Sequence, residues 1–173
     1  MVSYHLSEHY DLNHFGLYQQ IPILTKTISD SYPGHMEWID KKFLKQLHDG
    51  LRGYAFSVDY NAPVKVPNLL HPGQTLDSYH LSGCSLLKKD KYEKKICCLF
   101  VDPNYRKQGI ASRLIESSFE ILGTDKPLIT VSEHNLPQLK RLLEKFNFEL
   151  TSVKDSVYLP GIREYYYNEG LAR

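Results

Sequence analysis

The sequence lacks the long apolar run that a membrane-spanning helix requires. No stretch approaches the roughly 20 consecutive apolar residues needed to cross a bilayer. The first residues have neither a basic region nor an apolar core, so they do not resemble a secretory signal. We therefore expect no membrane partner and a cytoplasmic protein.

Cysteine is also scarce, and its placement excludes two kinds of site. The three cysteines are Cys84, Cys97 and Cys98. Three residues cannot form an even disulfide framework, and their spacing matches no metal motif. Cys97 and Cys98 are adjacent in an apolar run, so in a strand they should face opposite sides. We expect three reduced thiols, no metal, and no cysteine nucleophile, because no activating base is identifiable beside them.

The sequence has almost no excess of positive over negative charge. The 173 residues carry a formal net charge of +1, with 42% hydrophobic and 24% charged residues. This is typical of a single folded domain, expected over residues 1–173, and it argues against nucleic acid as a partner. A lysine cluster at residues 88–95 is either a solvated hairpin tip or an attractor of an anionic ligand. The sequence leaves a homodimer as an open alternative.

The segment from Lys94 to Gly123 predicts a strand, a tight loop and a helix. The apolar run 96–101 favours a strand buried on both faces. Small residues, Gly109 and Ala111, stand where the helix begins. The first N–H groups of a helix have no partner inside it and lie at the positive end of its dipole. With Arg106 and Lys107 beside them, these groups predict a phosphate-binding loop.

This segment resembles the GNAT acetyltransferases. Their signature is Gln or Arg, two residues, Gly, one residue, then Gly or Ala, and here it is Arg106, Gly109 and Ala111. The preceding residues 99–105 resemble the strand that leads into that signature. The resemblance implies an α/β (α+β) GNAT fold, with a mixed central sheet of about six or seven strands flanked by helices. It also implies a CoA cleft between the central strand (94–101) and the strand at 127–132.

The rest of the chain gives a matching order of elements. We expect strands at 2–6, 52–60, 78–87, 128–132, 148–153 and 163–168. Helices are expected at 15–28, interrupted near Pro22, and at 36–48, 108–122 and 135–146. The proline-rich segment 61–77 predicts a long loop or a hairpin excursion, and Gly83 marks a candidate bulge.

The resemblance implies acetyl-CoA as co-substrate. The backbone of residues 99–101 would pair with the pantetheine arm, and the pyrophosphate would lie on the N–H groups of residues 107–111. The family has an Asn that contacts the arm near the thioester, which here is Asn135. The implied cofactor-binding residues are Leu99, Phe100, Val101, Arg106, Lys107, Gln108, Gly109, Ile110, Ala111, Ser112 and Asn135.

The resemblance also implies transfer of the acetyl group to a primary amine by direct attack on the thioester. Many members use a Tyr of the following helix as general acid, and the matching position here is Leu143. Our catalytic candidates are therefore Tyr167, His134 and Glu93. Further alternatives for acid, base or relay are Tyr165, Tyr166, Glu133 and Glu164, and the acceptor-site candidates are Tyr32, His35, Glu37 and Trp38.

Two matters stay open at this level. The acceptor could be a small molecule, a peptide N-terminus, a lysine or an aminoacyl-tRNA. Because Leu143 replaces the usual Tyr, the alternative is a catalytically weak GNAT-fold module that binds acyl-CoA for regulation or interaction. Another nucleotide-binding class is disfavoured, since the loop is neither G-x-G-x-x-G nor a P-loop.

Overall fold

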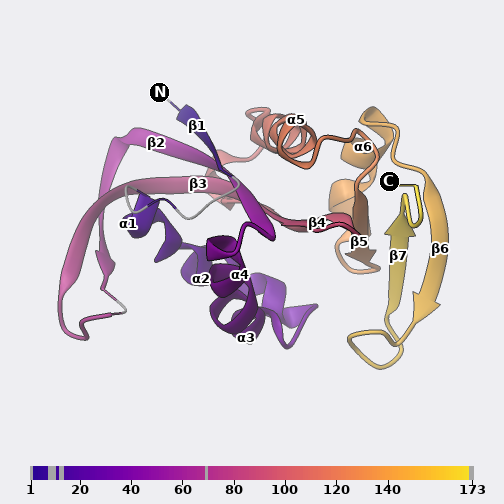
Figure 1. Cartoon of the computed structure of the whole chain (residues 1–173), viewed down its shortest axis with the longest axis horizontal. Coiled ribbons are helices and arrows are strands. Elements are labelled where there is room, and N and C mark those ends of the chain that lie inside the picture. The colour runs from indigo at the N-terminus through magenta and orange to yellow at the C-terminus, as the bar shows by residue number, and fades with distance from the viewer. Residues whose placement is uncertain (1, 8–10, 12–13, 69, 172–173) are drawn as a thin grey trace.

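A computed structural model of the chain describes residues 2–7, 11, 14–68 and 70–171. It has one mixed seven-stranded sheet with helices on both faces, which confirms the predicted fold (Figure 1). The strand order is β1-β2-β3-β4-β5-β7-β6. The strands are β1 Val2–Ser7, β2 Arg52–Pro67, β3 Thr75–Lys89, β4 Lys94–Val101, β5 Leu128–Ser132, β6 Leu150–Asp155 and β7 Arg163–Tyr167.

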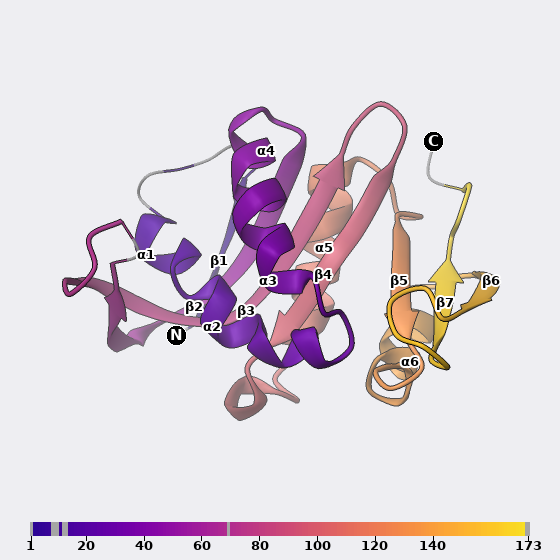
Figure 2. The same ribbon diagram turned by 90° about the horizontal axis from the view of Figure 1, so that it is seen from below.

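The helices form two groups. The first group follows β1 and comprises α1 Phe15–Tyr18, α2 Ile21–Leu24, a 3-10 turn Thr25–Asp30, α3 His35–Trp38, a π turn Ile39–Phe43 and α4 Leu44–His48. The second comprises a 3-10 turn Pro103–Tyr105, α5 Ile110–Leu122 and α6 Leu136–Lys145. The groups cover opposite faces of the sheet, as Figures 1 and 2 show together, and each face has its own apolar core.

The hairpin of β2 and β3 is longer than the sequence suggests. Residues 61–67 and 75–77 are paired strand, so the predicted long loop is wrong and the hairpin alternative is right; the connection covers only 68–74. The pairing with β1 ends at Asp59, and beyond it β2 is an edge strand. Edge strands tolerate proline, which explains Pro63 and Pro67 within a strand.

Close packing between α5 and β3 fixes the start of α5. A Cβ added to Gly83 would lie 2.9 Å from the Phe100 carbonyl and 3.1 Å from Ile110, so only glycine fits there. The register shift predicted at Gly83 falls next to it, at Ser82. The Ser85 and Ser118 hydroxyl groups are 2.8 Å apart across the same interface. The first turn of α5 is therefore held firmly against the sheet.

Strands β4 and β5 pair only where they begin. They are parallel, as expected, but only Lys95 with Leu128 and Ile96 with Ile129 are paired. A register shift on the other edge of β4 leaves Cys97 as an extra residue between Ile96 and Cys98. The sheet is therefore open between β4 and β5 beyond Ile96, and a bulge marks the place where it opens.

A helix that crosses a bilayer must be both long and apolar. None of the helices in residues 2–7, 11, 14–68 and 70–171 meets both requirements.

Candidate active-site cleft

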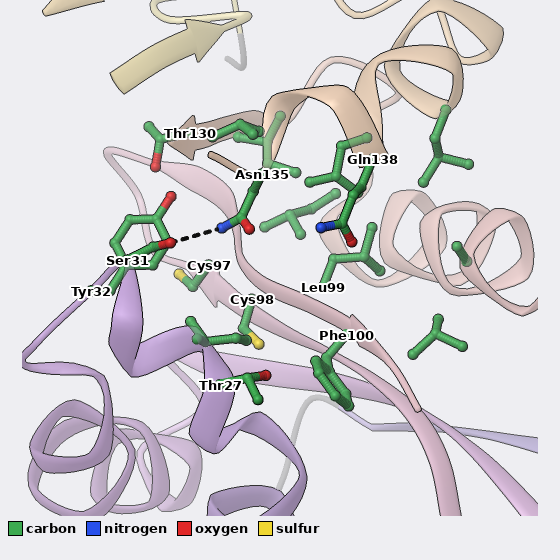
Figure 3. A pocket seen from close by; sticks show the side chains of 18 of the residues that line it. Thr27, Ser31, Tyr32, Cys97, Cys98, Leu99, Phe100, Thr130, Asn135 and Gln138 are labelled. Carbon is green, nitrogen blue, oxygen red and sulfur yellow. Dashed lines mark hydrogen bonds between the residues drawn. The ribbon is translucent and has the colours of Figure 1, made fainter. Parts of the chain in front are cut away.

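A large cleft of about 1220 Å³ lies where β4 and β5 separate. Its walls are β4, β5, the start of α5, one side of α6 and the segment from Thr27 to Trp38 (Figure 3). Two ends are distinguishable by chemistry. The end at residues 106–112 and α6 is called the cofactor end below, and the end at residues 27–38 is called the acceptor end.

The cofactor end is built on two left-handed residues before α5. Lys107 has φ 62° and Gly109 has φ 81°, and α5 begins at Ile110. No side chain caps this helix, and its first turn has no acidic residue. The N–H groups of residues 110–112 thus lie at the positive end of a 13-residue helix beside the cleft. This geometry suits a phosphate group.

Basic side chains surround this end of the cleft. Arg106, Lys107, Arg141 and Lys145 all line it. The Lys145 ammonium group donates to the Ser112 hydroxyl at 2.9 Å, which links α6 to the first turn of α5. The cluster includes two residues of α6, Arg141 and Lys145, that the sequence pattern did not single out. Their positions add positive charge on the side facing the loop.

The structure brings together nearly all of the predicted cofactor residues. Gln108 is exposed and does not line the cleft. Lining it are Leu99, Phe100, Val101, Arg106, Lys107, Gly109, Ile110, Ala111, Ser112 and Asn135.

Asn135 precedes α6, as predicted, but its side chain does not cap the helix. The Asn135 amide instead donates to the Ser31 hydroxyl at 3.3 Å, across the cleft (Figure 3). Asn135 therefore links α6 to the first helical group.

The residue of α6 expected at the position of the usual Tyr does not face the cleft. Leu143 is 2% exposed and belongs to the core under α5 and α6, so it does not face the cleft. The neighbouring Leu142 does line the cleft, with Leu139 one turn earlier. Both residues are aliphatic, so neither can take the place of the Tyr hydroxyl as a proton donor.

A tyrosine and a buried carboxylate meet at the acceptor end. The Tyr32 hydroxyl donates to Glu164 Oε1 at 2.8 Å and accepts from the Ser132 N–H at 3.0 Å. Tyr32 comes from the loop before α3, Glu164 from β7 and Ser132 from β5. Burial and the adjacent carboxylate raise the pKa of Tyr32, and burial raises the pKa of Glu164.

Tyr158 and Thr130 join this group, and sequence patterns gave no signal for either. The Tyr158 ring lies edge-on to Tyr32, with centroids 4.8 Å apart. The Thr130 side chain lies beside both Tyr158 and Glu164. Tyr158 lies in the polar connection between β6 and β7, where no periodicity marks a residue as functional.

His35 is a buried polar side chain at the same end. It is 7% exposed, lines the cleft and stacks on Trp38 with centroids 6.0 Å apart. Among the described residues, its Nε2 has no hydrogen-bond partner. Desolvation lowers the pKa of His35 to about 4, so the ring is neutral at pH 7.

Arg52 lies beside the bulge of β4. It is 6% exposed, and its Nε and Nη2 donate to Gln46 Oε1 at 2.8 and 2.6 Å. Its Nη1 is 3.6 Å from Cys97 Sγ. Cys97 and Cys98 both line the cleft, so the prediction that they face opposite sides is wrong, because the bulge turns Cys97. Burial raises the pKa of the Cys97 thiol, which disfavours the nucleophilic thiolate.

The predicted catalytic residues lie in three different settings. His134 lines the cleft and is exposed. Glu93 lies in the turn between β3 and β4, where Lys88 is 2.7 Å from its carboxylate, and it does not line the cleft. Tyr167 packs on the core beneath α5 and α6, also outside the cleft. The roles of all three stay predictions, and the geometry favours Tyr32 and Glu164 over Glu93 and Tyr167.

The acceptor-site candidates divide in the same way. Tyr32, His35 and Trp38 line the cleft. Glu37 points to solvent on the surface of α3, where it forms an ion pair with Lys41 at 3.0 Å. Within the described part of the chain, no group of three or more His, Cys, Asp or Glu side chains could hold a metal ion.

The middle part of the chain matches a known family model. Residues 76–150 match the sequence model of the acetyltransferase (GNAT) domain. These residues include β3, β4, the loop at 106–112, α5, β5 and α6, which carry the cofactor end. A search of curated protein sequences found no match.

Solved structures match the whole length of the chain. The NatC complex bound to Gag peptide and CoA has a chain with TM-score 0.68 and 20% identity, covering 96% of both chains. Arabidopsis thaliana NAA60 in complex with acetyl-CoA gives TM-score 0.60 and 17% identity over 96% of this chain and 98% of that one. A GNAT-family protein from Desulfovibrio desulfuricans gives 0.62 and 13%, over 96% and 97%. At these identities the likeness establishes the fold.

Proposed function

We propose that this chain, which has the GNAT fold and matches the acetyltransferase (GNAT) domain model over residues 76–150, transfers an acetyl group from acetyl-CoA to a primary amine. The amine attacks the thioester directly. The observation that carries the proposal is the cleft itself. An uncapped helix N-terminus suited to a phosphate group lies at one end, a buried polar group lies at the other, and the open edge of β4 joins them.

The cofactor end supports the placement of acetyl-CoA. The pyrophosphate lies on the N–H groups that follow Gly109, with Arg106 and Lys107 beside it. The pantetheine arm follows β4 from Val101 towards Cys97, where β4 has no strand partner on the side of β5. A main-chain N–H of this stretch stabilises the thioester oxyanion, and Asn135 lies opposite, near the reacting end.

The acceptor enters from the side of residues 27–38. This end of the cleft offers hydroxyl groups, a neutral imidazole and aromatic rings from Tyr32, His35, Trp38 and Tyr158. Such a surface suits an amine that arrives with uncharged polar groups, as a peptide N-terminus does. The NatC structure contains a peptide together with CoA, in keeping with that class of acceptor.

A screen of acceptor amines tests this function. Thiol release from acetyl-CoA is followed with a peptide bearing a free N-terminus, a peptide with a blocked N-terminus and one lysine, spermidine, and an aminoglycoside. We expect acetylation of at least one amine, verified by the mass of the product. Acetyl-CoA binding without turnover on any of them would contradict the transferase.

That contradicting result would support the second function, a module that binds acyl-CoA without efficient catalysis. Leu139 and Leu142 favour it, because neither aliphatic side chain can supply the proton that the usual Tyr gives to the departing thiolate. In that case acetyl-CoA and CoA bind with similar affinity, and no amine in the screen accelerates thiol release.

A further inference from the structure

Glu164 is a buried carboxylate that has no ion-pair partner among the residues that the structure describes. It is 2% exposed on β7, where its backbone neighbours are Ser132 of β5 and Lys154 of β6. The Tyr32 hydroxyl donates a hydrogen bond to it and the Thr130 side chain lies beside it, and both are uncharged. Removing a carboxylate from water costs free energy unless a cation compensates it. A group kept at that cost, directly behind a cleft, is a candidate for chemistry.

Tyr32 connects this carboxylate to the cleft. Its ring lines the cleft close to Thr130 and Cys97, where β4 and β5 have separated (Figure 3). The hydroxyl donates its proton to Glu164 and accepts the Ser132 N–H. A hydroxyl oxygen has two lone pairs, so one is left for a proton from the cleft. The hydroxyl can therefore receive one proton while it passes its own to Glu164.

We propose that Glu164, acting through the Tyr32 hydroxyl, receives the proton that the acceptor amine loses as it attacks acetyl-CoA. This inference rests on the proposed acetyl transfer. The amine nitrogen forms a bond to the acetyl carbon, and the carbon–sulfur bond breaks with its electron pair on sulfur. The proton on nitrogen moves to the Tyr32 oxygen, the Tyr32 proton moves to Glu164 Oε1, and the thiolate takes a proton from solvent.

The surroundings of Glu164 fit a proton acceptor. Burial raises its pKa, which makes the carboxylate a stronger base than an exposed one. The titratable groups that face it are Tyr32 before α3, Tyr158 before β7, Tyr166 on β7 and Lys95 on β4. The tyrosines have raised pKa values and stay neutral. The charge of Lys95 favours the ionised carboxylate and so opposes part of the effect of burial.

Glu164 acts through Tyr32, so the tests must separate proton transfer from mere placement of the ring. Glu164→Gln keeps an oxygen that can accept from Tyr32 but cannot take up a proton. Tyr32→Phe keeps the ring and removes the route. Glu169→Gln is the matched control, because Glu169 is a carboxylate just after β7 that instead pairs with Lys154.

The rates are measured by thiol release between pH 6 and 9, with saturating acetyl-CoA and the fastest amine of the screen; acetyl-CoA affinity is measured by calorimetry. We expect Glu164→Gln and Tyr32→Phe each to lower kcat about 100-fold, with KM and acetyl-CoA Kd within about threefold. The double variant should be no slower than the slower single one, because both break one route. Glu164→Gln should also change the pH dependence of kcat, and Glu169→Gln should match the wild type.

Several results would overturn the inference. One is a Glu164→Gln variant with wild-type kcat and pH profile; another is a rise in KM with kcat unchanged, which would make Glu164 a binding residue. If Glu164→Gln fails to bind acetyl-CoA, Tyr32→Phe decides alone, and a wild-type kcat in that variant excludes the route. If the wild type is inactive on every amine of the screen, the proposed acetyl transfer itself is contradicted. If the wild type and both variants are equally active, acetyl transfer stands and only the proton route is excluded.

Discussion

The two ends of the cleft are built in different ways. The cofactor end comes mainly from one contiguous stretch, residues 99–112, and its binding groups are main-chain N–H groups set by two left-handed residues. The acceptor end gathers side chains from residues 31–38, 95–98, 130, 158 and 164. Main-chain geometry holds a ligand part that never varies, whereas side chains from several elements can be exchanged singly. The contrast suggests that the fold determines which co-substrate binds, whereas substitution of single side chains determines which acceptor binds.

The largest effect should come from Gly109→Glu at the cofactor end. The variant places a carboxylate where the phosphate groups bind and a side chain at φ 81°, so acetyl-CoA affinity should fall by at least about 100-fold. Calorimetric titration with CoA measures it. The matched control is Gly73→Glu, because Gly73 has φ 89° and equal space but lies in the distant β2–β3 connection. Unchanged CoA affinity in folded Gly109→Glu would remove the basis of the comparison.

Two neighbouring leucines of α6 test different roles. One should support the cofactor end from the core, and the other should contact the ligand. Leu143→Ala should lower the free energy of unfolding by about 2–4 kcal/mol, since Leu143 is fully packed in the core. Its kcat should stay at the wild-type value below its melting temperature. Leu142→Ala should destabilise less and should weaken acetyl-CoA binding, since Leu142 faces the cleft. Urea denaturation and calorimetry give both quantities, and the reverse order would contradict the placement.

The free energy of unfolding should depend on pH because of His35 at the acceptor end. The folded pKa of His35 is about 4, below its ordinary value of 6.5, so its contribution is complete above pH 6.5 and is lost as pH falls towards 4. The loss should be about 2–3 kcal/mol of unfolding free energy. Urea denaturation at pH 7 and 4.5 should show a smaller difference in His35→Gln than in the wild type. His134→Gln, at an exposed position, is the control and should keep the wild-type difference.

The smallest effect concerns the basic side chains of α6. Lys145→Met and Arg141→Met should each weaken CoA binding about two- to fivefold, and the loss should shrink at high salt because both side chains are exposed. Lys140→Met is the control, since Lys140 lies on the same helix near Glu144 and does not line the cleft. Equal losses in all three variants would indicate a general charge effect in place of local contacts.

The same contrast explains how much the sequence could predict. The order of elements and the cofactor loop were predictable, because Arg106, Gly109 and Ala111 lie close together and glycine at a left-handed position has a local cause. Tyr158 was not predictable, because it lies in an irregular connection. The partner of Asn135 is Ser31, 104 residues away, so its side-chain contact depends on tertiary packing.

Register caused the other differences. Cys97 was expected to alternate with Cys98, but the bulge depends on the pairing of β4 with β3 and not on β4 alone. The prolines at 63 and 67 suggested a loop, and they are tolerated because β2 has lost its neighbour there. Leu143 was expected at the position that many GNAT members fill with a Tyr, and the structure shows that Leu142 faces the cleft instead.

The short junction between β4 and β5 links ligand occupancy to cooperativity of unfolding. Strands β5, β7 and β6 join the rest of the sheet through two residue pairs, aided by Tyr32 and by the packing of α6 on α5. A ligand that lies along both strands supplies the missing ladder, and by mass action it stabilises the folded state by about 2.7 kcal/mol at 100 times its Kd. Amide hydrogens of the C-terminal third should therefore exchange fastest in the empty protein and slow down most when acetyl-CoA is bound.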